Sequence, residues 1–131
     1  MNNIIIRNEE KLIQKTNLVT KEKGLILTHK EIEELIINKN ETLYNLSRIE
    51  VTPIIDKIIY EFYDSPYIDN DNYFEIINSL VEIFYIYEDK FGNELSIEEI
   101  IKYLRDTFDN KVNGVVELLV DTSYLEREHD E

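Results

Sequence analysis

The apolar residues of this chain recur every third or fourth position over most of its length, with polar residues between them. This spacing places apolar side chains on one face of a helix, whereas a strand would show alternation at every second position. The single Asn-Gly pair, Asn113-Gly114, is flanked by helical patterns, so the signal of a β-hairpin is missing. We therefore predict an all-α fold, a compact single-domain bundle or orthogonal array of about six helices over residues 1–131.

The first predicted helix, over residues 4–21, has the weakest pattern. Ile5, Leu12 and Val19 would share one face of it, but its middle is polar, and Gly24 marks its end. Residues 1–24 are therefore predicted to form an N-terminal helix, with an extended arm as the alternative.

Two further helices begin with the same start signal. Thr28 can accept a hydrogen bond from the backbone N–H of Glu31 while the glutamate side chain reaches back, which is the pattern of a capping box. Ser96 and Glu99 repeat this arrangement. The sequence therefore predicts one helix after Thr28 and another after Ser96, and the second of these is the best determined element.

The third and fourth predicted helices lie on either side of the turn Asp64-Ser65-Pro66. Thr52 is the expected cap of the third helix and Pro53 its first residue, a position where the missing N–H of proline costs nothing. The fourth helix is expected to start within residues 69–72, where short polar side chains can cap exposed amides, and to run to about Asp89. Because it is apolar over most of its circumference, we expect it to lie at the centre of the fold.

A sixth, shorter helix is expected over residues 115–120, followed by a charged tail at residues 125–131 that we expect to be flexible. With 131 residues and 43% hydrophobic content, the chain can build one core but not two ordinary ones.

The charge of the chain is strongly acidic and unevenly distributed. Its formal net charge is -14, and residues 1–40 carry seven basic and six acidic side chains, so the later residues carry -15. Such a surface repels nucleic-acid phosphates and anionic lipids and attracts basic partners. We therefore expect no direct nucleic-acid binding and no membrane binding, although the acidity could also serve only to keep a small protein soluble.

The chain contains no cysteine, and its N-terminus has too few consecutive apolar residues for a signal peptide. No other stretch approaches the roughly 18 apolar residues that a membrane span requires. The sequence therefore predicts a cytoplasmic protein.

No sequence motif indicates catalysis, metal binding or nucleotide binding. The best register for a calcium loop starts at Glu88, but it places Lys90 where the ion needs an anionic ligand. His29 and His129 are far apart, and three glycines leave little room for a phosphate-binding loop. We therefore predict no catalytic residue, no cofactor and no metal site, with an enzyme whose site is assembled from distant residues as an alternative.

Tyrosines gather around the turn Asp64-Ser65-Pro66, in a chain with nine tyrosines and no tryptophan. Tyrosines rimmed by acidic side chains are typical of protein interfaces. The alternative is that the rings fill the seam between the third and fourth helices while their hydroxyls reach water. The candidate interaction surface consists of Tyr60, Tyr63, Asp64, Ser65, Pro66, Tyr67, Asp69, Asp71 and Tyr73.

Four segments give the chain a resemblance to a known family. They are residues 62–68, which contain the Ser-Pro-Tyr-Ile turn, together with Asn72-Tyr73, residues 83–85 and residues 24–28. With these segments the chain resembles an uncharacterised family of small acidic proteins from clostridia and related Firmicutes, a domain of unknown function. The resemblance implies a single domain and an origin in that group, and it implies no function.

The leading hypothesis is a non-enzymatic protein–protein interaction module with an acidic, Tyr-rich surface. Its unknown partner would be a protein with a basic or mixed apolar–basic surface, and a homo-oligomer is a further alternative. A second hypothesis is an acidic nucleic-acid mimic that inhibits a DNA-binding protein, because carboxylates on helices can imitate phosphates. The third is the enzyme with a composite site.

Overall fold

The computed structural model describes the backbone of residues 3–121 and the side chains of residues 8–121. Within this part of the chain all regular structure is helical, which confirms the predicted all-α class, and the sixth predicted helix is a short 3-10 helix. The predicted tail, residues 125–131, lies outside the described residues. The elements are α1 (Asn3–Thr20), η1 (Lys21–Lys23), α2 (His29–Asn45), α3 (Ile55–Phe62), α4 (Tyr73–Phe91), α5 (Ile97–Asn110) and η2 (Val116–Val120).

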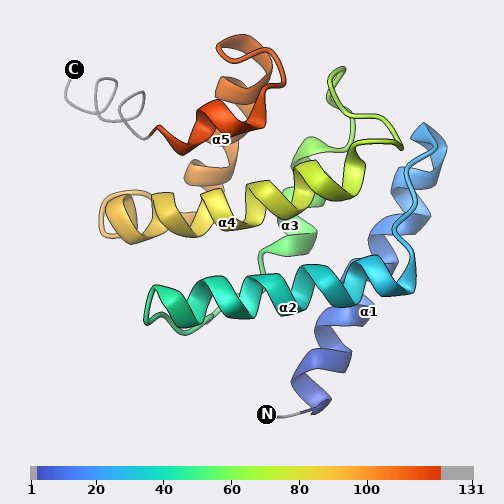
Figure 1. The fold of residues 1–131 in the computed structure, drawn as a ribbon, viewed down its shortest axis with the longest axis horizontal. Helices are drawn as coiled ribbons and strands as arrows, with labels where there is room; N and C mark the ends of the chain where they lie inside the picture. Colours follow the sequence, from blue (N-terminus) through green and yellow to red (C-terminus); the bar gives the residue numbers. More distant parts are fainter. Residues whose placement is uncertain (1–2, 122–131) are drawn as a thin grey trace.

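The helices form an orthogonal array rather than a parallel bundle. α2 and α4 lie side by side, while α1 and α5 run steeply across them in Figure 1. α1 packs on α2 and α3, and α3 also contacts α4 and α5. α5 and η2 cover the side of α4 that faces away from α2.

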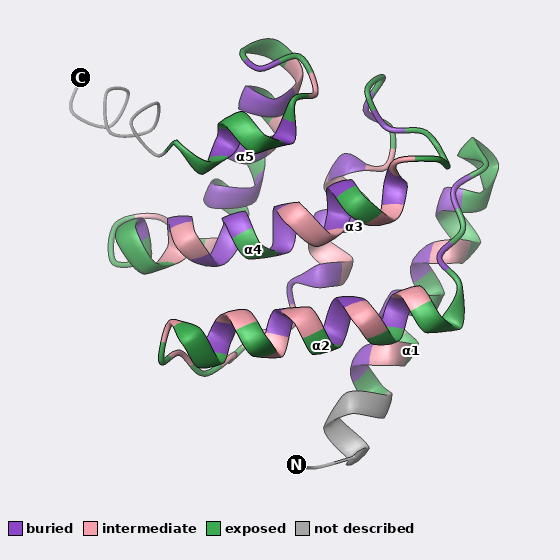
Figure 2. Cartoon of the chain, in the orientation of Figure 1, coloured by how far each residue is buried: buried purple, intermediate pink, exposed green. Residues whose placement is uncertain are grey.

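The core is centred on α4, as its wide apolar surface predicted. This helix contacts α2, α3, α5 and η2, and Ile77, Leu80 and Phe84 on it are completely buried. Figure 2 shows the buried residues on the faces that these helices turn toward one another. The burial of an apolar side chain contributes roughly 1.5–3 kcal/mol, so this shared interior is the main source of stability.

The two predicted capping boxes are confirmed. The Glu31 N–H donates to Thr28 Oγ1 over 3.1 Å, and Thr28 N–H donates to Glu31 Oε1 over 2.9 Å. The corresponding distances at Ser96 and Glu99 are 3.1 and 2.9 Å. Because these hydrogen bonds stabilise the ionised glutamate, the pKa of Glu99 lies below its usual value.

The predicted start of the third helix is wrong. α3 begins at Ile55 and has no side-chain cap, so Thr52 does not cap it and Pro53 is not its first residue. Ile54 and Ile55 are both buried, so their packing, rather than local capping, determines where the chain enters this helix.

α4 runs from Tyr73 with Asn72 as its N-cap, so it starts where the polar residues 69–72 predicted, but their side chains do not cap it. Asp69 instead accepts hydrogen bonds from the backbone N–H groups of Asp71 and Asn72, at 2.9 and 3.1 Å. These side chains therefore stabilise a turn that precedes the helix, because a short polar side chain can bond the backbone two or three residues ahead.

α1 is a helix from Asn3 onward rather than an extended arm, but its predicted inward face is wrong. Val19 is exposed, and the buried face carries Glu9, Ile13, Thr16 and Thr20. The threonine hydroxyls are satisfied locally, since Thr16 donates to the Ile13 carbonyl over 2.6 Å. Apolar spacing could not identify a face whose residues are mostly polar. α1 is followed directly by η1, and the helical segment as a whole ends at the predicted Gly24, whose φ is +76°.

A polar pair joins the two central helices. Asn38 Nδ2 on α2 donates to Asn78 Oδ1 on α4 over 3.0 Å, in a partly buried position. This hydrogen bond lies among apolar contacts between the two helices.

Candidate functional site

The inward face of α2 contains a lysine at a position where the pattern predicts an apolar residue. Ile32, Leu35, Ile36 and Leu43 are buried at helical spacing, and Lys39 occupies the same stripe with only 3% of its surface exposed. A buried ammonium group requires partners that offset its lost hydration. The structure supplies them from two other segments, α1 and the connection between α2 and α3.

Glu9 of α1 is the first partner of Lys39. The Lys39 ammonium donates to Glu9 Oε2 over 2.7 Å and to Glu9 Oε1 over 2.9 Å, and Glu9 is itself 5% exposed. Two oxygens of one carboxylate thus accept from one ammonium group in a setting with little water, where electrostatic attraction is stronger than at the surface.

Glu50, in the connection between α2 and α3, is the second partner. Its Oε1 accepts from Lys39 over 3.0 Å, and its Oε2 accepts from the Tyr85 hydroxyl of α4 over 2.5 Å. Burial, and next the adjacent Glu50 carboxylate, raise the pKa of Tyr85 well above its ordinary value, so the tyrosine keeps its proton and acts as a donor. We call Glu9, Lys39, Glu50 and Tyr85 the buried cluster.

The buried cluster contains more acidic than basic groups. Two carboxylates pair with the one ammonium group, and a third, that of Asp56 in the first turn of α3, interacts electrostatically with Glu9 and with Glu50. Burial, which penalises the charged form, raises the pKa of Glu9 and also that of Asp56. The cluster therefore favours proton uptake by these two acids relative to the unfolded chain.

The geometry makes the buried cluster an anchor rather than a reaction centre. An ammonium group has three N–H donors, and all three of Lys39 are used by Glu9 and Glu50. With 3% of its surface exposed, the lysine cannot meet a substrate without loss of these bonds. The arrangement instead fixes the position of Glu50, and with it the connection between α2 and α3.

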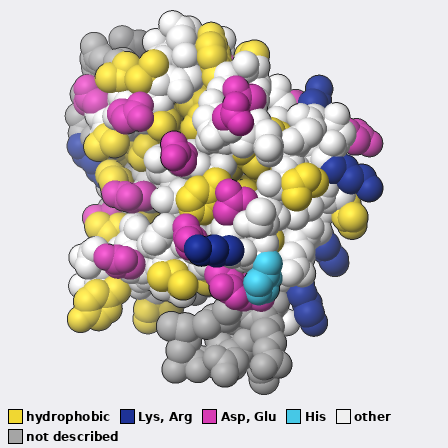
Figure 3. Space-filling model, turned by 45° about the vertical axis from the view of Figure 1, so that its right-hand side comes forward, with side chains coloured by type: hydrophobic (Ala, Val, Ile, Leu, Met, Phe, Trp, Pro, Cys, Tyr) yellow, Lys and Arg dark blue, Asp and Glu magenta, His cyan; other side chains and the backbone are white. Residues whose placement is uncertain are grey.

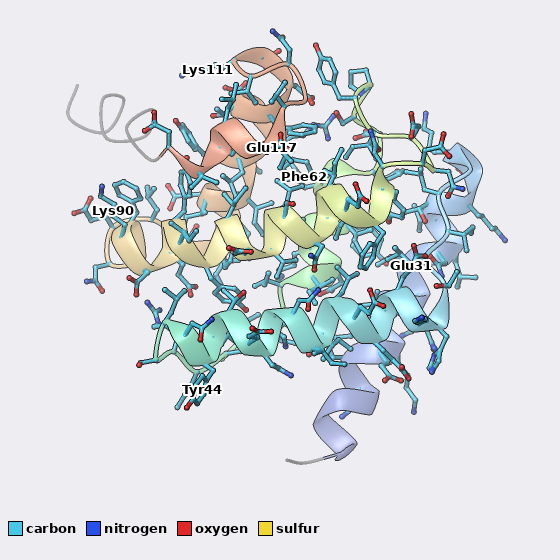
Figure 4. The ribbon with its side chains drawn as sticks, viewed as in Figure 1. Glu31, Tyr44, Phe62, Lys90, Lys111 and Glu117 are labelled. Atoms are coloured by element: carbon cyan, nitrogen blue, oxygen red, sulfur yellow. The ribbon has the colours of Figure 1, made fainter. Side chains whose placement is uncertain are left out.

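In that connection a charged side chain faces the core while its apolar neighbours face solvent, an arrangement that we call inverted polarity. Glu50 points toward the core, with 16% of its side chain exposed, whereas its neighbours Ile49 and Val51 are 87% and 93% exposed. Tyr44, in the last turn of α2, is 84% exposed, and Figure 4 shows its side chain pointing away from the body of the molecule. These are the three most exposed large apolar side chains in the described part of the chain. We call Tyr44, Ile49 and Val51 the apolar patch.

Charged side chains lie beside the apolar patch. Arg48, which precedes Ile49, pairs with Asp89 over 3.0 Å and with Glu88 over 3.3 Å at the end of α4. These three side chains line a polar surface pocket of about 140 Å³. Glu41, one turn before Tyr44 on α2, is exposed. With one arginine against three carboxylates, this rim is acidic.

The predicted Tyr-rich surface is only partly at the surface. Ser65 and Tyr73 are buried, so neither can present its side chain to a partner, and their inclusion in the surface was wrong. Burial raises the pKa of Tyr73 to about 12. Tyr63 is half-buried, and the exposed members are Tyr60, Asp64, Pro66, Tyr67, Asp69 and Asp71.

α5 holds this turn in place. Ser65 Oγ donates to Asp109 Oδ1 over 2.7 Å, and Arg105 bridges Asp64 at 2.8 Å and Asp109 at 2.7 Å. Arg105 also donates to the Glu61 carbonyl. The turn is therefore clasped to the C-terminal half of α5 by a continuous set of charged hydrogen bonds.

Tyr67 packs against the same region. Its ring meets Phe108 edge-on with 6.1 Å between centroids, and its hydroxyl donates to Asn113 Oδ1 over 3.3 Å. The predicted alternative, a ring that fills the seam between α3 and α4, is wrong for Tyr67, because the ring lies on α5 and the turn that follows it.

Comparison with known families decides one point of identity. A family of unknown function, DUF6323, matches residues 12–129. The chain belongs to this family. No curated protein and no solved structure matches it. The predicted resemblance to an uncharacterised domain family is therefore confirmed, and the origin in Firmicutes stays a prediction.

The described part of this DUF6323 chain has neither a metal-binding arrangement of side chains nor a membrane-spanning helix. Within residues 3–121 no three His, Asp or Glu side chains are arranged so that they could hold a metal ion. In the same part, none of the helices has the length and apolar character needed to cross a bilayer.

Sequence reasoning missed the buried cluster in this DUF6323 member, although one signal was present. Lys39 falls on the apolar stripe of α2 at the spacing of its buried neighbours, and a lysine on such a stripe requires a carboxylate partner. Glu9 and Glu50 carry no comparable signal, because their roles depend on which segments fold against α2.

Proposed function

We propose that this protein is a non-enzymatic interaction module that binds a protein partner through the apolar patch. The observation that carries the proposal is the inverted polarity of the α2–α3 connection, in which Glu50 is directed inward while Ile49 and Val51 are almost fully exposed. Single exposed apolar residues are ordinary on protein surfaces. Three that fall within residues 44–51, each more than four-fifths exposed, support a contact area at this end of α2.

The apolar patch has the composition of an interface centre. Tyrosine supplies a large, rigid contact area with a polar tip, and two β-branched side chains lose little rotamer freedom when they are buried. Burial of each of these side chains by a partner can supply roughly 1.5–3 kcal/mol before the cost of association. A small number of such residues carries most of the affinity of typical interfaces.

The acidic rim determines the class of partner. Glu41 lies beside Tyr44, and Glu88 and Asp89 together outweigh Arg48. A basic or mixed apolar–basic protein surface therefore complements this site, and the net charge of -14 speeds its approach at low ionic strength. The same net charge disfavours a second copy as the occupant.

The other two hypotheses have less support. A nucleic-acid mimic requires carboxylates in an extended row, whereas on the face in Figure 3 the acidic side chains lie among apolar ones. A composite enzyme site would need a reachable reactive group, and the hydrogen bonds and burial of Lys39 disfavour that role.

The proposal is tested by comparison of two matched triple variants. The patch variant is Tyr44→Ser/Ile49→Ser/Val51→Ser, and the control is Leu18→Ser/Tyr60→Ser/Leu118→Ser, which removes three exposed apolar side chains elsewhere, one of them from the Tyr-rich surface. Partners captured from a lysate of the source cells by the wild-type protein are purified, and their Kd for all three proteins is measured by calorimetry.

We expect the patch variant to lose about 30-fold or more in affinity, as is typical when interface hot spots are removed. The control should bind within about threefold of wild type, because isolated surface contacts contribute little. Equal binding by the patch variant and the wild type would reject the site. A greater loss in the control would move the interface to the other surfaces.

A further inference from the structure

The α2–α3 connection couples the direction of three consecutive side chains. Along residues 49–51 exposure alternates, with Ile49 out, Glu50 in and Val51 out. Because Glu50 is directed inward while both of its sequence neighbours are directed outward, a backbone rotation that turned Glu50 outward would also change the directions of Ile49 and Val51. If Glu50 turned toward solvent, Ile49 and Val51 would turn toward Lys39, a buried ammonium group that an apolar side chain cannot satisfy.

Helices from three parts of the chain converge on Glu50. Lys39 of α2 donates to one carboxylate oxygen at 3.0 Å, and Tyr85 of α4 donates to the other at 2.5 Å. Glu9 of α1 also accepts from Lys39, at 2.7 and 2.9 Å. Both oxygens of Glu50 are thus occupied by donors on rigid elements.

The residues before Glu50 add a second constraint. Ser47 has a left-handed backbone with φ of +55°, and the Arg48 N–H donates to the Leu43 carbonyl over 2.8 Å, so α2 ends in a tight, hydrogen-bonded bend. The Arg48 guanidinium then pairs with Glu88 and Asp89 of α4. The chain is therefore fixed on both sides of Ile49.

We infer that Glu50 is a positioning residue for the apolar patch. Its carboxylate accepts hydrogen bonds from Lys39 and Tyr85, and this keeps Ile49 and Val51 directed outward, in the conformation that binds the partner. This inference rests on the proposed function, and it adds that Glu50 preorganises the connection that carries Ile49 and Val51. A preorganised loop loses less conformational entropy on binding, so part of the affinity comes from residues that never touch the partner. Glu9 contributes indirectly, because it fixes the position of Lys39.

A role in positioning differs measurably from a role in general stability. If Glu50 acts on the connection, its removal should open residues 48–52 while the central helix stays closed. If Glu50 only supports the fold, its removal should increase opening everywhere by the same factor. Trypsin offers a local probe, because it cleaves after Arg48 within the connection and after Lys23 in the distant exposed turn.

The experiment uses the full chain with Glu50→Gln and Glu50→Ala. Glutamine keeps the size and an accepting oxygen, so it is the milder change if alanine impairs folding. Cleavage after Arg48 is followed by mass spectrometry, with cleavage after Lys23 as the internal reference. Hydrogen exchange is measured in parallel at residues 49–51 and at residues 77–84 of α4.

We expect cleavage after Arg48 to accelerate about tenfold or more in Glu50→Ala, and less in Glu50→Gln, because loss of charged hydrogen bonds raises the population of the open connection. Cleavage after Lys23 and exchange in α4 should change far less. The inference is overturned if cleavage after Arg48 is unchanged, or if exchange in α4 accelerates by the same factor as exchange in the connection.

An all-apolar variant, Glu9→Leu/Lys39→Met/Glu50→Leu/Tyr85→Phe, provides the rescue. Apolar replacement of a buried charged group is often neutral or stabilising, and the leucine that replaces Glu50 would anchor the connection by its own burial. We expect slow cleavage after Arg48 and partner affinity to return together. Because proteolysis requires no partner, the two claims fail separately: a loosened connection with unchanged binding would overturn the role of Glu50 in preparing the site, whereas unchanged binding by the patch variant would reject the site itself.

Discussion

The connections on either side of α3 treat their apolar residues in opposite ways. Between α2 and α3, the charged side chain of Glu50 is directed inward and Ile49 and Val51 are directed outward. Between α3 and α4, Ile68 is buried and Tyr67 packs on Phe108, while the charged side chains are at the surface. Which residues a loop displays is thus determined by the one side chain that the core binds.

The difference also shows why exposure, rather than composition, supports the proposed interaction site. The Tyr-rich turn has the amino acids that interfaces favour, yet α5 holds it through Ser65 and Arg105. The α2–α3 connection has an unremarkable composition, but it exposes its apolar side chains almost completely. A structural contact accounts for the first segment, whereas in the described part of the chain the three exposed side chains of the second are available to the proposed partner.

We expect the largest effect when Lys39, which anchors the α2–α3 connection through Glu50, is replaced. Lys39→Met leaves the inward carboxylates of Glu9 and Glu50 without their cation, so we expect the free energy of unfolding to fall by about 3–5 kcal/mol. Urea denaturation followed by circular dichroism measures it. Lys57→Met, which breaks a 3.7 Å surface pair with Glu98, should change stability by about 0.5 kcal/mol or less. Similar losses in both variants would contradict the role of burial.

We expect the second largest effect when the contact between Gly114 and Tyr67, a residue of the Tyr-rich turn, is disturbed. A Cβ added at Gly114 would lie 2.5 Å from Cβ and Cγ of Tyr67, and the φ of Gly114 is +82°. Gly114→Ala should therefore cost about 2–4 kcal/mol, from backbone strain together with overpacking. Gly24→Ala is the matched control, with φ of +76° and no atom within 4 Å of the added Cβ, and should cost about 1–2 kcal/mol. Equal thermal stability of the two variants would show that Tyr67 is not held at Gly114.

We expect the smallest effect in the pH dependence of stability, to which Glu9 and Asp56 contribute. The folded pKa values of Glu9 and Asp56 lie above their ordinary values of 4.5 and 3.8, so the folded protein binds more protons than the unfolded chain just above those values. These two acids therefore contribute most to stability below their ordinary pKa values, and this contribution is lost as the pH rises through the folded ones.

Glu9→Gln isolates this contribution. Because glutamine does not titrate, the stability of the variant relative to wild type should increase as the pH rises from about 4 toward 7 in urea denaturation series. Glu41→Gln, at an exposed position on α2, reports the effect of removing one surface charge. A relative stability of Glu9→Gln that falls with rising pH would show that the pairing with Lys39 outweighs burial.

Local signals in the sequence predicted local structure. The Thr28–Glu31 and Ser96–Glu99 boxes require only residues three apart, and both form as expected. The central place of α4 followed from its own apolar surface. The start of α3 could not be predicted in this way, because it depends on the packing of Ile54 and Ile55 against other helices.

The candidate site depended even more on distant contacts. Glu9 and Lys39 are 30 residues apart, and Tyr85 is 35 residues from Glu50. Arg105, which clasps the Tyr-rich turn, is 41 residues from Asp64. Lys39 could have been noticed as a charge on an apolar stripe, but its partners become identifiable only when the helices are placed in space.

The amide pair between Asn38 and Asn78 selects one alignment of the two central helices. Leucines and isoleucines can interdigitate in more than one longitudinal arrangement, because apolar contacts have little directionality. If α2 moved by one turn along α4, the two amides would no longer meet and their hydrogen bond would be lost, as happens to polar residues in coiled-coil seams when they are mismatched. A modest hydrogen bond thus discriminates among competing packings, and a leucine at either position would relax that choice even where it strengthened the contact.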